Sequence, residues 1–186
     1  MDDTTRSGAD PIHVSLLAIP DAVVSTLTGI FDVMNAFKMM GGLSGQWGPP
    51  PFRVEIVGQR RGPVGLASGV PVDVQRGVDE IETTDIVIVP SILLPDGGWS
   101  KGRYPDLVAW LADVHARGAM LCSACSGLFL IAETGLFDGR EATVHYGYAP
   151  QFAASYPDIR IHPERVLVIS GRREELVSSG ASMTWH

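Results

Sequence analysis

The stretch Gly118-Ala-Met-Leu-Cys122-Ser-Ala-Cys125-Ser-Gly127 decides the fold, because an apolar run meets a cluster of small residues within it. Apolar residues resume at helical spacing up to Glu133, which predicts a strand, a sharp turn and a helix. In such a turn the residue at the strand end is pushed outward, and the free N–H groups of the helix point at it. A thiol in this turn would be unusually acidic, which makes Cys125 a candidate reactive thiol, and an inert buried thiol is the alternative.

The spacing of the two cysteines, Cys122 and Cys125, is also typical of a thioredoxin-like redox pair. Such a pair has both thiols at the start of a helix, whereas Cys122 falls inside the predicted strand. Two cysteines without a disulfide framework favour a reducing compartment. The leader at residues 1–11 is expected to be disordered and has no signal-peptide core, and no run of about 18 apolar residues occurs. A cytoplasmic location, with no membrane partner, is therefore expected.

Length and composition predict one domain over residues 12–186. A chain of 186 residues with 45% hydrophobic content can bury one substantial core. Its 14 Lys and Arg against 21 Asp and Glu give a formal charge of −7, which argues against gripping a nucleic-acid backbone through a broad basic surface. Any contact with DNA would need another domain.

Strand and helix patterns alternate along the chain and predict an α/β fold around a mostly parallel sheet. Apolar runs predict buried strands at 12–19 and 85–90, and an alternating pattern predicts a strand at 52–57. Helical spacing predicts helices at 24–40, where Gly41-Gly42 should end the helix, and at 105–117. The segment 60–78 suggests an extended excursion or small hairpin. Shorter extended pieces and helical turns are predicted at 142–145, 148–156, 159–161, 165–169 and 175–179.

A reactive thiol needs a nearby base, and His145 is the leading candidate. A core or surface role for this histidine stays open. An oxyanion hole would use the Ser126 N–H and a second N–H from Ser91 or Ile92. No carboxylate that would orient His145 can be identified, and the scattered histidines give no metal-binding set.

Five motifs stand out in the second half of the chain: Cys125-Ser-Gly127, Leu130-Ile-Ala-Glu-Thr-Gly-Leu-Phe-Asp-Gly-Arg140, Ala142-Thr-Val-His145-Tyr-Gly-Tyr148, Tyr156-Pro157 and Ser179-Gly-Ala-Ser182. These motifs resemble the ThiJ/PfpI superfamily, whose members are related to class I glutamine amidotransferases. More narrowly, the chain resembles the amino-terminal domain of GlxA-type regulators of the AraC family. The resemblance implies a flavodoxin-like three-layer sandwich, a homodimer and no cofactor.

In the enzymes of this superfamily, the resemblance implies a cysteine working beside a histidine and near a carboxylate that follows the first strand. Cys125 and His145 match the first two, so they are the candidate catalytic pair. Alignment of the segment 29–33 puts Thr26 at the position of the carboxylate. The usual glycine-rich turn after the central strand is Pro90-Ser91-Ile92 here, where a β-branched Ile92 would restrict an oxyanion. Both departures count against hydrolysis.

The resulting hypothesis is a small-molecule-sensing, dimerising domain of a transcriptional regulator. Its expected ligand-binding residues are Thr26, Ser91, Ile92, Cys125, Ser126 and His145. The family pattern would continue past Trp185 into a helix and then a DNA-binding domain, so the chain resembles a sensor domain alone. The alternatives are a cysteine-dependent hydrolase or hydratase of the same fold and a scaffold that only dimerises.

Overall fold

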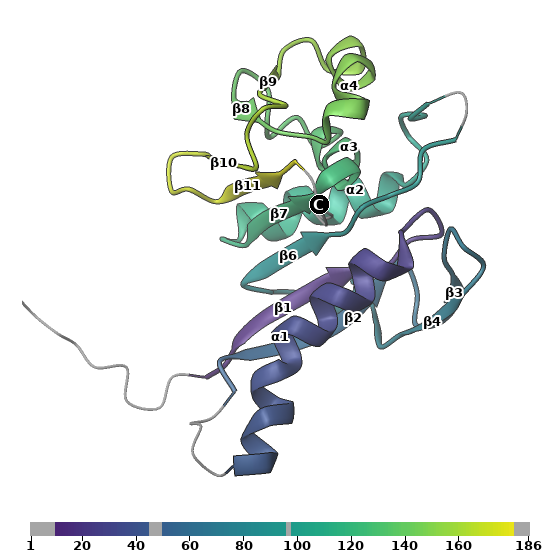
Figure 1. Ribbon diagram of the computed structural model, residues 1–186, viewed down its shortest axis with the longest axis vertical. Coiled ribbons are helices and arrows are strands. Elements are labelled where there is room, and N and C mark those ends of the chain that lie inside the picture. The colour runs from purple at the N-terminus through teal and green to yellow at the C-terminus, as the bar shows by residue number, and fades with distance from the viewer. Residues whose placement is uncertain (1–9, 45–49, 96–97, 181–186) are drawn as a thin grey trace, which may run out of the picture.

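A mostly parallel sheet forms the centre of the protein in a computed structural model that describes residues 10–44, 50–95 and 98–180 (Figure 1). Among these residues, seven strands lie in the order β10-β11-β7-β6-β1-β2-β5. Every neighbouring pair is parallel except β10 and β11. The strands are β1 (Ile12–Leu17), β2 (Phe52–Gly58), β5 (Arg76–Gly77), β6 (Ile86–Val89), β7 (Met120–Ala124), β10 (Leu167–Ser170) and β11 (Leu176–Ser179).

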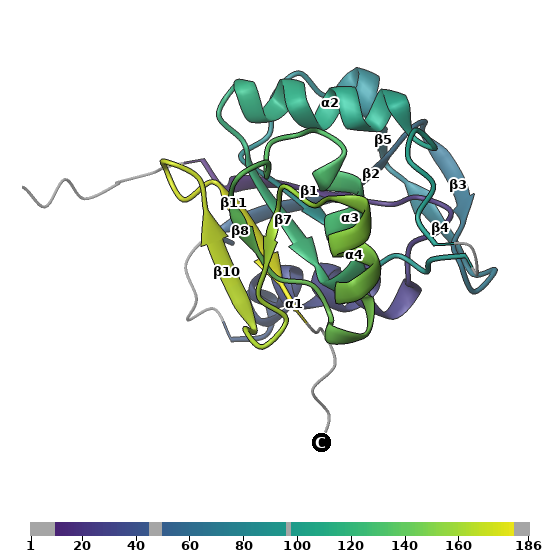
Figure 2. The ribbon, with the colours of Figure 1, turned by 90° about the horizontal axis from the view of Figure 1, so that it is seen from above.

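Helices cover both faces of this sheet, which confirms the predicted three-layer α/β sandwich. Figure 2 shows α1 (Val24–Ser44) on one face and α2 (Pro105–Ala116) on the other. The short helix α3 (Leu128–Ala132) packs against α2, β6 and β7. The crossover from β1 to β2 through α1 runs towards the β5 edge of the sheet, and the crossover from β6 to β7 through α2 runs towards the β10 edge. The connections therefore reverse direction between β1 and β6.

Smaller units fill the connections. Strands β3 (Gly62–Gly65) and β4 (Pro71–Val74) form an antiparallel hairpin, which confirms the hairpin expected within 60–78. Strands β8 (Glu141–Ala142) and β9 (Arg160–Ile161) pair separately from the main sheet. A 3-10 turn at Val78–Glu80 follows β5, and helix α4 (Ala149–Ser155) lies between β8 and β9 in the chain.

Several predicted boundaries differ from the structure by one to four residues, among them the ends of β1 and α1. Strand β1 ends at Leu17 rather than Ile19, although the Ala18 N–H still donates to the Val57 carbonyl. Helix α1 continues to Ser44, so the expected stop at Gly41-Gly42 is wrong. Glycine costs only about 1 kcal/mol relative to alanine inside a helix, which allows an established helix to continue through it. Most of the expected disordered leader and the expected helix start after Ser182 lie outside the described residues.

The core combines aliphatic side chains of the strands with an aromatic cluster beneath α3 and α4. Phe129, Phe137 and Phe152 are fully buried. The rings of Phe129 and Phe152 meet edge to face with their centroids 4.9 Å apart. Each such side chain contributes about 2 to 3 kcal/mol by leaving water. None of the helices within the described ranges has the length and apolar character needed to cross a bilayer.

Candidate functional site

A cavity of about 300 Å³ lies where the connections reverse between β1 and β6, at the carboxyl ends of the strands. Crevices at this position are the usual ligand sites of open α/β sheets. All six side chains predicted to bind a ligand line this cavity. The lining residues are Val23, Ser25, Thr26, Ser91, Ile92, Leu93, Cys125, Ser126, His145 and Tyr148.

The turn after β7 holds Cys125 in a strained backbone conformation. Its φ angle is +52°, a left-handed value that a residue with a side chain rarely adopts. Such strain persists only where the surrounding structure enforces it, and it is concentrated at functional sites. The side chain is 9% exposed and lies in the cavity wall. The strand, turn and helix predicted from the sequence are therefore confirmed.

The helix after this turn is short and buried, as the sequence predicts. A 3-10 turn at Cys125–Gly127 comes first, and α3 then has five residues. Every residue from Cys125 to Ala132 is buried, so this segment is part of the core.

Two small residues lock the turn against the end of β6. A Cβ added to Gly127 would lie 2.5 Å from the carbonyl oxygens of both Val89 and Pro90. The Ser126 hydroxyl donates to the Ile92 carbonyl at 2.6 Å and accepts from the Ile92 N–H at 2.9 Å. The close approach explains why the sequence has small residues here, and the paired hydrogen bonds fix the loop that follows β6.

This pair of hydrogen bonds changes the expected oxyanion hole. The Ile92 N–H, one of the two predicted second donors, already donates to Ser126. Ile92 is only 1% exposed, so its side chain is packed into the hydrophobic core. The Ile92 N–H is therefore not available as the second donor to an oxyanion beside Cys125.

His145 lies in the same cavity as Cys125, but it is oriented by its own chain. Its Nδ1 accepts a hydrogen bond from the Gly147 N–H at 3.1 Å, so in the neutral ring the proton is on Nε2. The Tyr146 ring packs on the imidazole with the centroids 4.3 Å apart. Within the described residues, no hydrogen bond joins His145 to the Cys125 thiol. The two side chains share a cavity, but they do not form a hydrogen-bonded pair of nucleophile and base.

A carboxylate is missing from the residues that line the cavity. Thr26 lies in its wall, where the resemblance places an acidic residue in the enzymes. Glu164, one of the acidic residues near His145 in sequence, pairs instead with His162 at 3.3 Å. The lining side chains include no Asp, Glu, Lys or Arg, and the cavity is therefore suited to an uncharged ligand.

The loop from Ser91 to Tyr104 is held at both ends. The Trp99 indole N–H donates to Glu133 Oε1 at 2.7 Å, and the Gly102 N–H donates to Glu133 Oε2 at 2.8 Å. At the start of the loop, the Leu93 N–H donates to the Asp21 carbonyl at 2.7 Å. These contacts make Trp99 an anchor of this loop. The acceptor of both hydrogen bonds is the Glu133 carboxylate, a role that no sequence pattern indicated.

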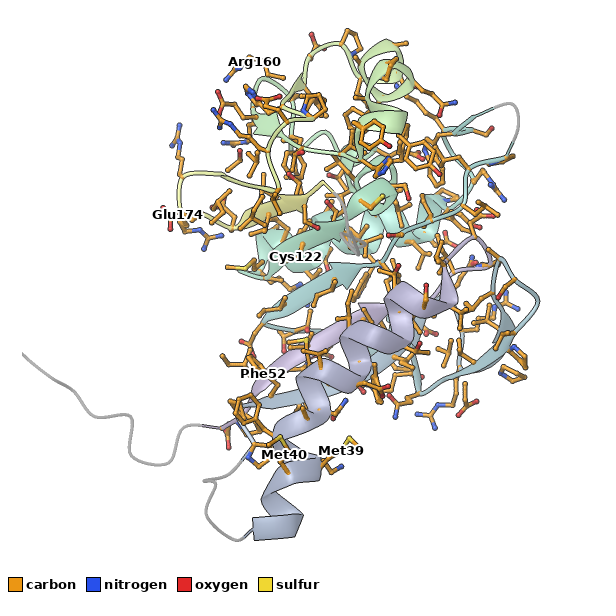
Figure 3. All side chains as sticks on the ribbon, viewed as in Figure 1. Met39, Met40, Phe52, Cys122, Arg160 and Glu174 are labelled. Carbon is orange, nitrogen blue, oxygen red and sulfur yellow. The ribbon has the colours of Figure 1, made fainter. Side chains whose placement is uncertain are left out.

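Cys122 lies within β7, as expected (Figure 3). It is in register with Ile88 and Val177 on the neighbouring strands. Burial raises the pKa of its thiol to about 11. Both cysteines are free. The thioredoxin-like alternative is not supported, because one thiol is in the strand and resists ionisation.

Sequence reasoning missed three lining residues, Val23, Ser25 and Leu93. Each is within three positions of a predicted one, so extending the candidate set along the same turn would have found them. Tyr148 also lines the cavity, with its ring centroid 6.0 Å from that of His145, and in the sequence it stood out only as part of a motif.

Known proteins with similar sequences include a transcriptional regulator and an enzyme. The HTH-type transcriptional regulator CdhR of Pseudomonas aeruginosa is 28% identical over 131 residues, which are 70% of this chain and 37% of that protein. Isonitrile hydratase of Pseudomonas putida is 22% identical over 140 residues, 74% of this chain and 54% of the enzyme. The chain therefore spans well under two thirds of either relative.

A solved AraC family transcriptional regulator from Pseudomonas putida has the same fold, with a TM-score of 0.69 and 17% identity. The match covers 92% of this chain and 84% of that one. The sequence profile of the DJ-1/PfpI family matches residues 32–181, which include the turn at Cys125 and His145. The chain therefore belongs to the DJ-1/PfpI family.

Proposed function

We propose that this chain is the small-molecule-sensing domain of an AraC-type transcriptional regulator. The observation that carries the proposal is a cavity that contains Cys125 and His145 but no carboxylate among its lining residues. Without a hydrogen bond between thiol and imidazole, and without an acidic residue to orient the ring, proton transfer to and from a substrate is poorly supported. Binding without turnover needs only the cavity, and CdhR is named as a regulator.

In this proposal the ligand is small and uncharged, and Cys125 and His145 contact it. Ser91 and Thr26 offer hydroxyl groups, whereas the Ser126 hydroxyl is already paired with Ile92. The apolar surface comes from Val23, Ile92 and Leu93. DNA would be contacted by a separate helix-turn-helix domain, in keeping with the net charge of −7 of this chain.

The proposal also includes a homodimer through the outer face of α1. Val33 and Met39 of this helix are 72% and 65% exposed, and Met40 is 49% exposed. Figure 3 shows Met39 and Met40 near the end of α1, which extends beyond the strands in Figure 1. A shallow apolar depression around Gly29 and Val33 shares Ser25 and Thr26 with the Cys125 cavity. Exposed apolar surface of this kind favours a protein contact.

A ligand screen tests the sensing proposal. Thermal shift assays with a library of small uncharged metabolites should find a compound that stabilises the wild type. Cys125→Ala should weaken that compound's binding about tenfold or more, whereas Cys122→Ala, the matched control outside the cavity, should not. Mass spectrometry should recover the compound unchanged. Consumption of the compound over many turnovers would contradict the proposal.

A cysteine-dependent hydratase is the second candidate, favoured by the strained φ of Cys125 and by the similarity to isonitrile hydratase. Incubation with an alkyl isonitrile distinguishes the two. A hydratase would add water to form the N-alkylformamide and lose this activity in Cys125→Ala. The sensing proposal predicts no formamide above the rate of the Cys125→Ala protein.

The oligomeric state is tested by light scattering during gel filtration. Val33→Glu should convert a dimer to a monomer, because it places a charge in the centre of the proposed contact. Val70→Glu, at the tip of the β3–β4 hairpin, is the control, since Val70 is also exposed, at 45%. A wild-type monomer, or a dimer that survives Val33→Glu, would exclude this interface.

A further inference from the structure

A second and larger cavity, of about 460 Å³, lies at the same edge of the sheet on the other side of β1. Its walls are the turn after β1, the turn after β2, the β3–β4 hairpin and the start of α2. No residue that lines it also lines the Cys125 cavity. Its volume is within the range of small-molecule sites.

The floor of this cavity is apolar and buried. Ile19, Val74 and Leu107 line it and are each no more than 1% exposed as residues of the main core. They come from three separate elements that the fold brings together. An apolar group placed on this floor would gain about 25 cal/mol for each Å² that it removes from water.

The rim is cationic, because Arg60 and Arg61 follow each other in the turn after β2. Within residues 10–44, 50–95 and 98–180, the Arg60 side chain makes no hydrogen bond or ion pair. Arg61 pairs with Glu80 at 3.2 Å, but both side chains are largely exposed, so this ion pair holds it weakly. Two adjacent guanidinium groups are therefore available to a ligand.

The carboxylate of Asp21, which contacts the wall residue Tyr104, is already neutralised. Asp21 accepts a hydrogen bond from the Tyr104 hydroxyl at 2.8 Å and an ion pair from Arg103 at 2.8 Å. Burial, with Asp21, raises the pKa of Tyr104 far above its usual value, so the phenol remains a donor. Asp106, at the start of α2, accepts from the Gln59 amide at 3.1 Å. These contacts reduce the repulsion that an anion would meet at the rim.

We propose that this second cavity binds a small amphipathic carboxylate, with its apolar body on Ile19, Val74 and Leu107 and its carboxylate on Arg60 and Arg61. A planar guanidinium binds a carboxylate through two parallel hydrogen bonds, which an alcohol cannot form. The site is independent of the Cys125 cavity, so it would exist whether that cavity senses or catalyses.

The test is a titration with 4-phenylbutyrate and its uncharged counterpart 4-phenylbutanol, followed by amide NMR shifts of the whole chain. The acid should produce saturable shifts at Gln59–Arg61 and at Tyr104–Leu107, and the alcohol should bind several-fold more weakly. Arg60→Gln with Arg61→Gln should weaken the acid about tenfold and leave the alcohol unchanged. Arg53→Gln with Arg172→Gln removes the same charge from exposed positions elsewhere and should change neither.

Three results would overturn this proposal. The first is the absence of saturable shifts up to roughly 10 mM acid, which is weaker than ordinary specific binding. The second is equal affinity for acid and alcohol, or for the wild type and the Arg60→Gln, Arg61→Gln variant. The third is a set of shifts centred on Ser91, Ile92 and Tyr148, which would place the acid in the Cys125 cavity and leave the sensing proposal intact.

Discussion

Two cavities flank the turn after β1, and they differ in how they are built. The Cys125 cavity has no charged side chain in its lining and is fixed by backbone contacts: the Ser126 bonds to Ile92 and the fit of Gly127 against β6. The second cavity has two exposed arginines over an apolar floor, and its supporting contacts are mostly between side chains. The same edge of the sheet therefore carries a rigid, neutral cavity beside an adaptable, cationic one.

The largest expected difference between the two regions is in how much a glycine-to-alanine substitution lowers the free energy of unfolding. Gly127→Ala should lower the free energy of unfolding by about 3 kcal/mol, because the new Cβ meets two backbone carbonyls that cannot move. Gly77→Ala, beside the Arg60–Arg61 turn, should cost about 1 kcal/mol or less, because its Cβ meets the movable Asp79 side chain. Urea denaturation of both variants measures this. Equal losses would remove the distinction between rigid and adaptable.

The next effect separates the two thiols of the β7 turn. Alkylation requires the thiolate, and burial raises the pKa of Cys122 to about 11. In the Cys125→Ala variant, iodoacetamide at pH 8 should therefore label folded Cys122 about 100-fold more slowly than the urea-unfolded chain. Because the folded pKa is the higher one, the ratio should shrink as pH rises towards 11. Equal rates in the folded and unfolded chains at pH 8 would refute the burial of this thiol.

A smaller effect is expected from the Ser126 hydroxyl. Ser126→Ala leaves the buried Ile92 N–H and carbonyl without their partner and should cost about 2 kcal/mol of unfolding free energy. Ser25→Ala, an exposed residue of the same cavity, should stay within about 0.5 kcal/mol of the wild type. Chemical denaturation compares the two. A loss as large in Ser25→Ala would show that the paired bonds do not fix the loop.

The smallest effect concerns the wall of the second cavity. Tyr104→Phe removes one hydrogen bond to Asp21, while Arg103 still pairs with that carboxylate, so the cost should be about 1 kcal/mol. Tyr146→Phe is the control, because Tyr146 is 74% exposed and should be nearly neutral. If Tyr104→Phe cost more than Ser126→Ala, the second cavity would be the more rigid of the two.

The sequence predicted the fold well where residue types restrict the backbone. The apolar runs of β1 and β6 can be buried only in a covered parallel sheet, and the small residues around Cys125 fit only a close turn. The end of α1 was mispredicted because local glycines are weak stop signals inside an established helix.

The site was predictable as a set of residues but not as chemistry. Cys125, His145 and Thr26 come together at the edge of the sheet because the connections reverse there, which the order of elements implies. The bonds of Ser126 to Ile92 and of Gly147 to His145 depend on side-chain and loop geometry that no spacing encodes. The second cavity was not predicted, because in the sequence Arg60 and Arg61 are typical of ordinary surface charges. Only the fold brings them into one cavity with Leu107.

The central claim is that the Cys125 thiol and the His145 ring face one accessible cavity. In the Cys122→Ala variant, iodoacetamide should modify Cys125, and the NMR resonances of the His145 ring should shift. Those of His162, which lies beside Glu141 and Glu164 outside the cavity, should stay in place. A Cys125 that cannot be alkylated in the folded chain, or a modified Cys125 that leaves the His145 resonances unchanged, would contradict the account.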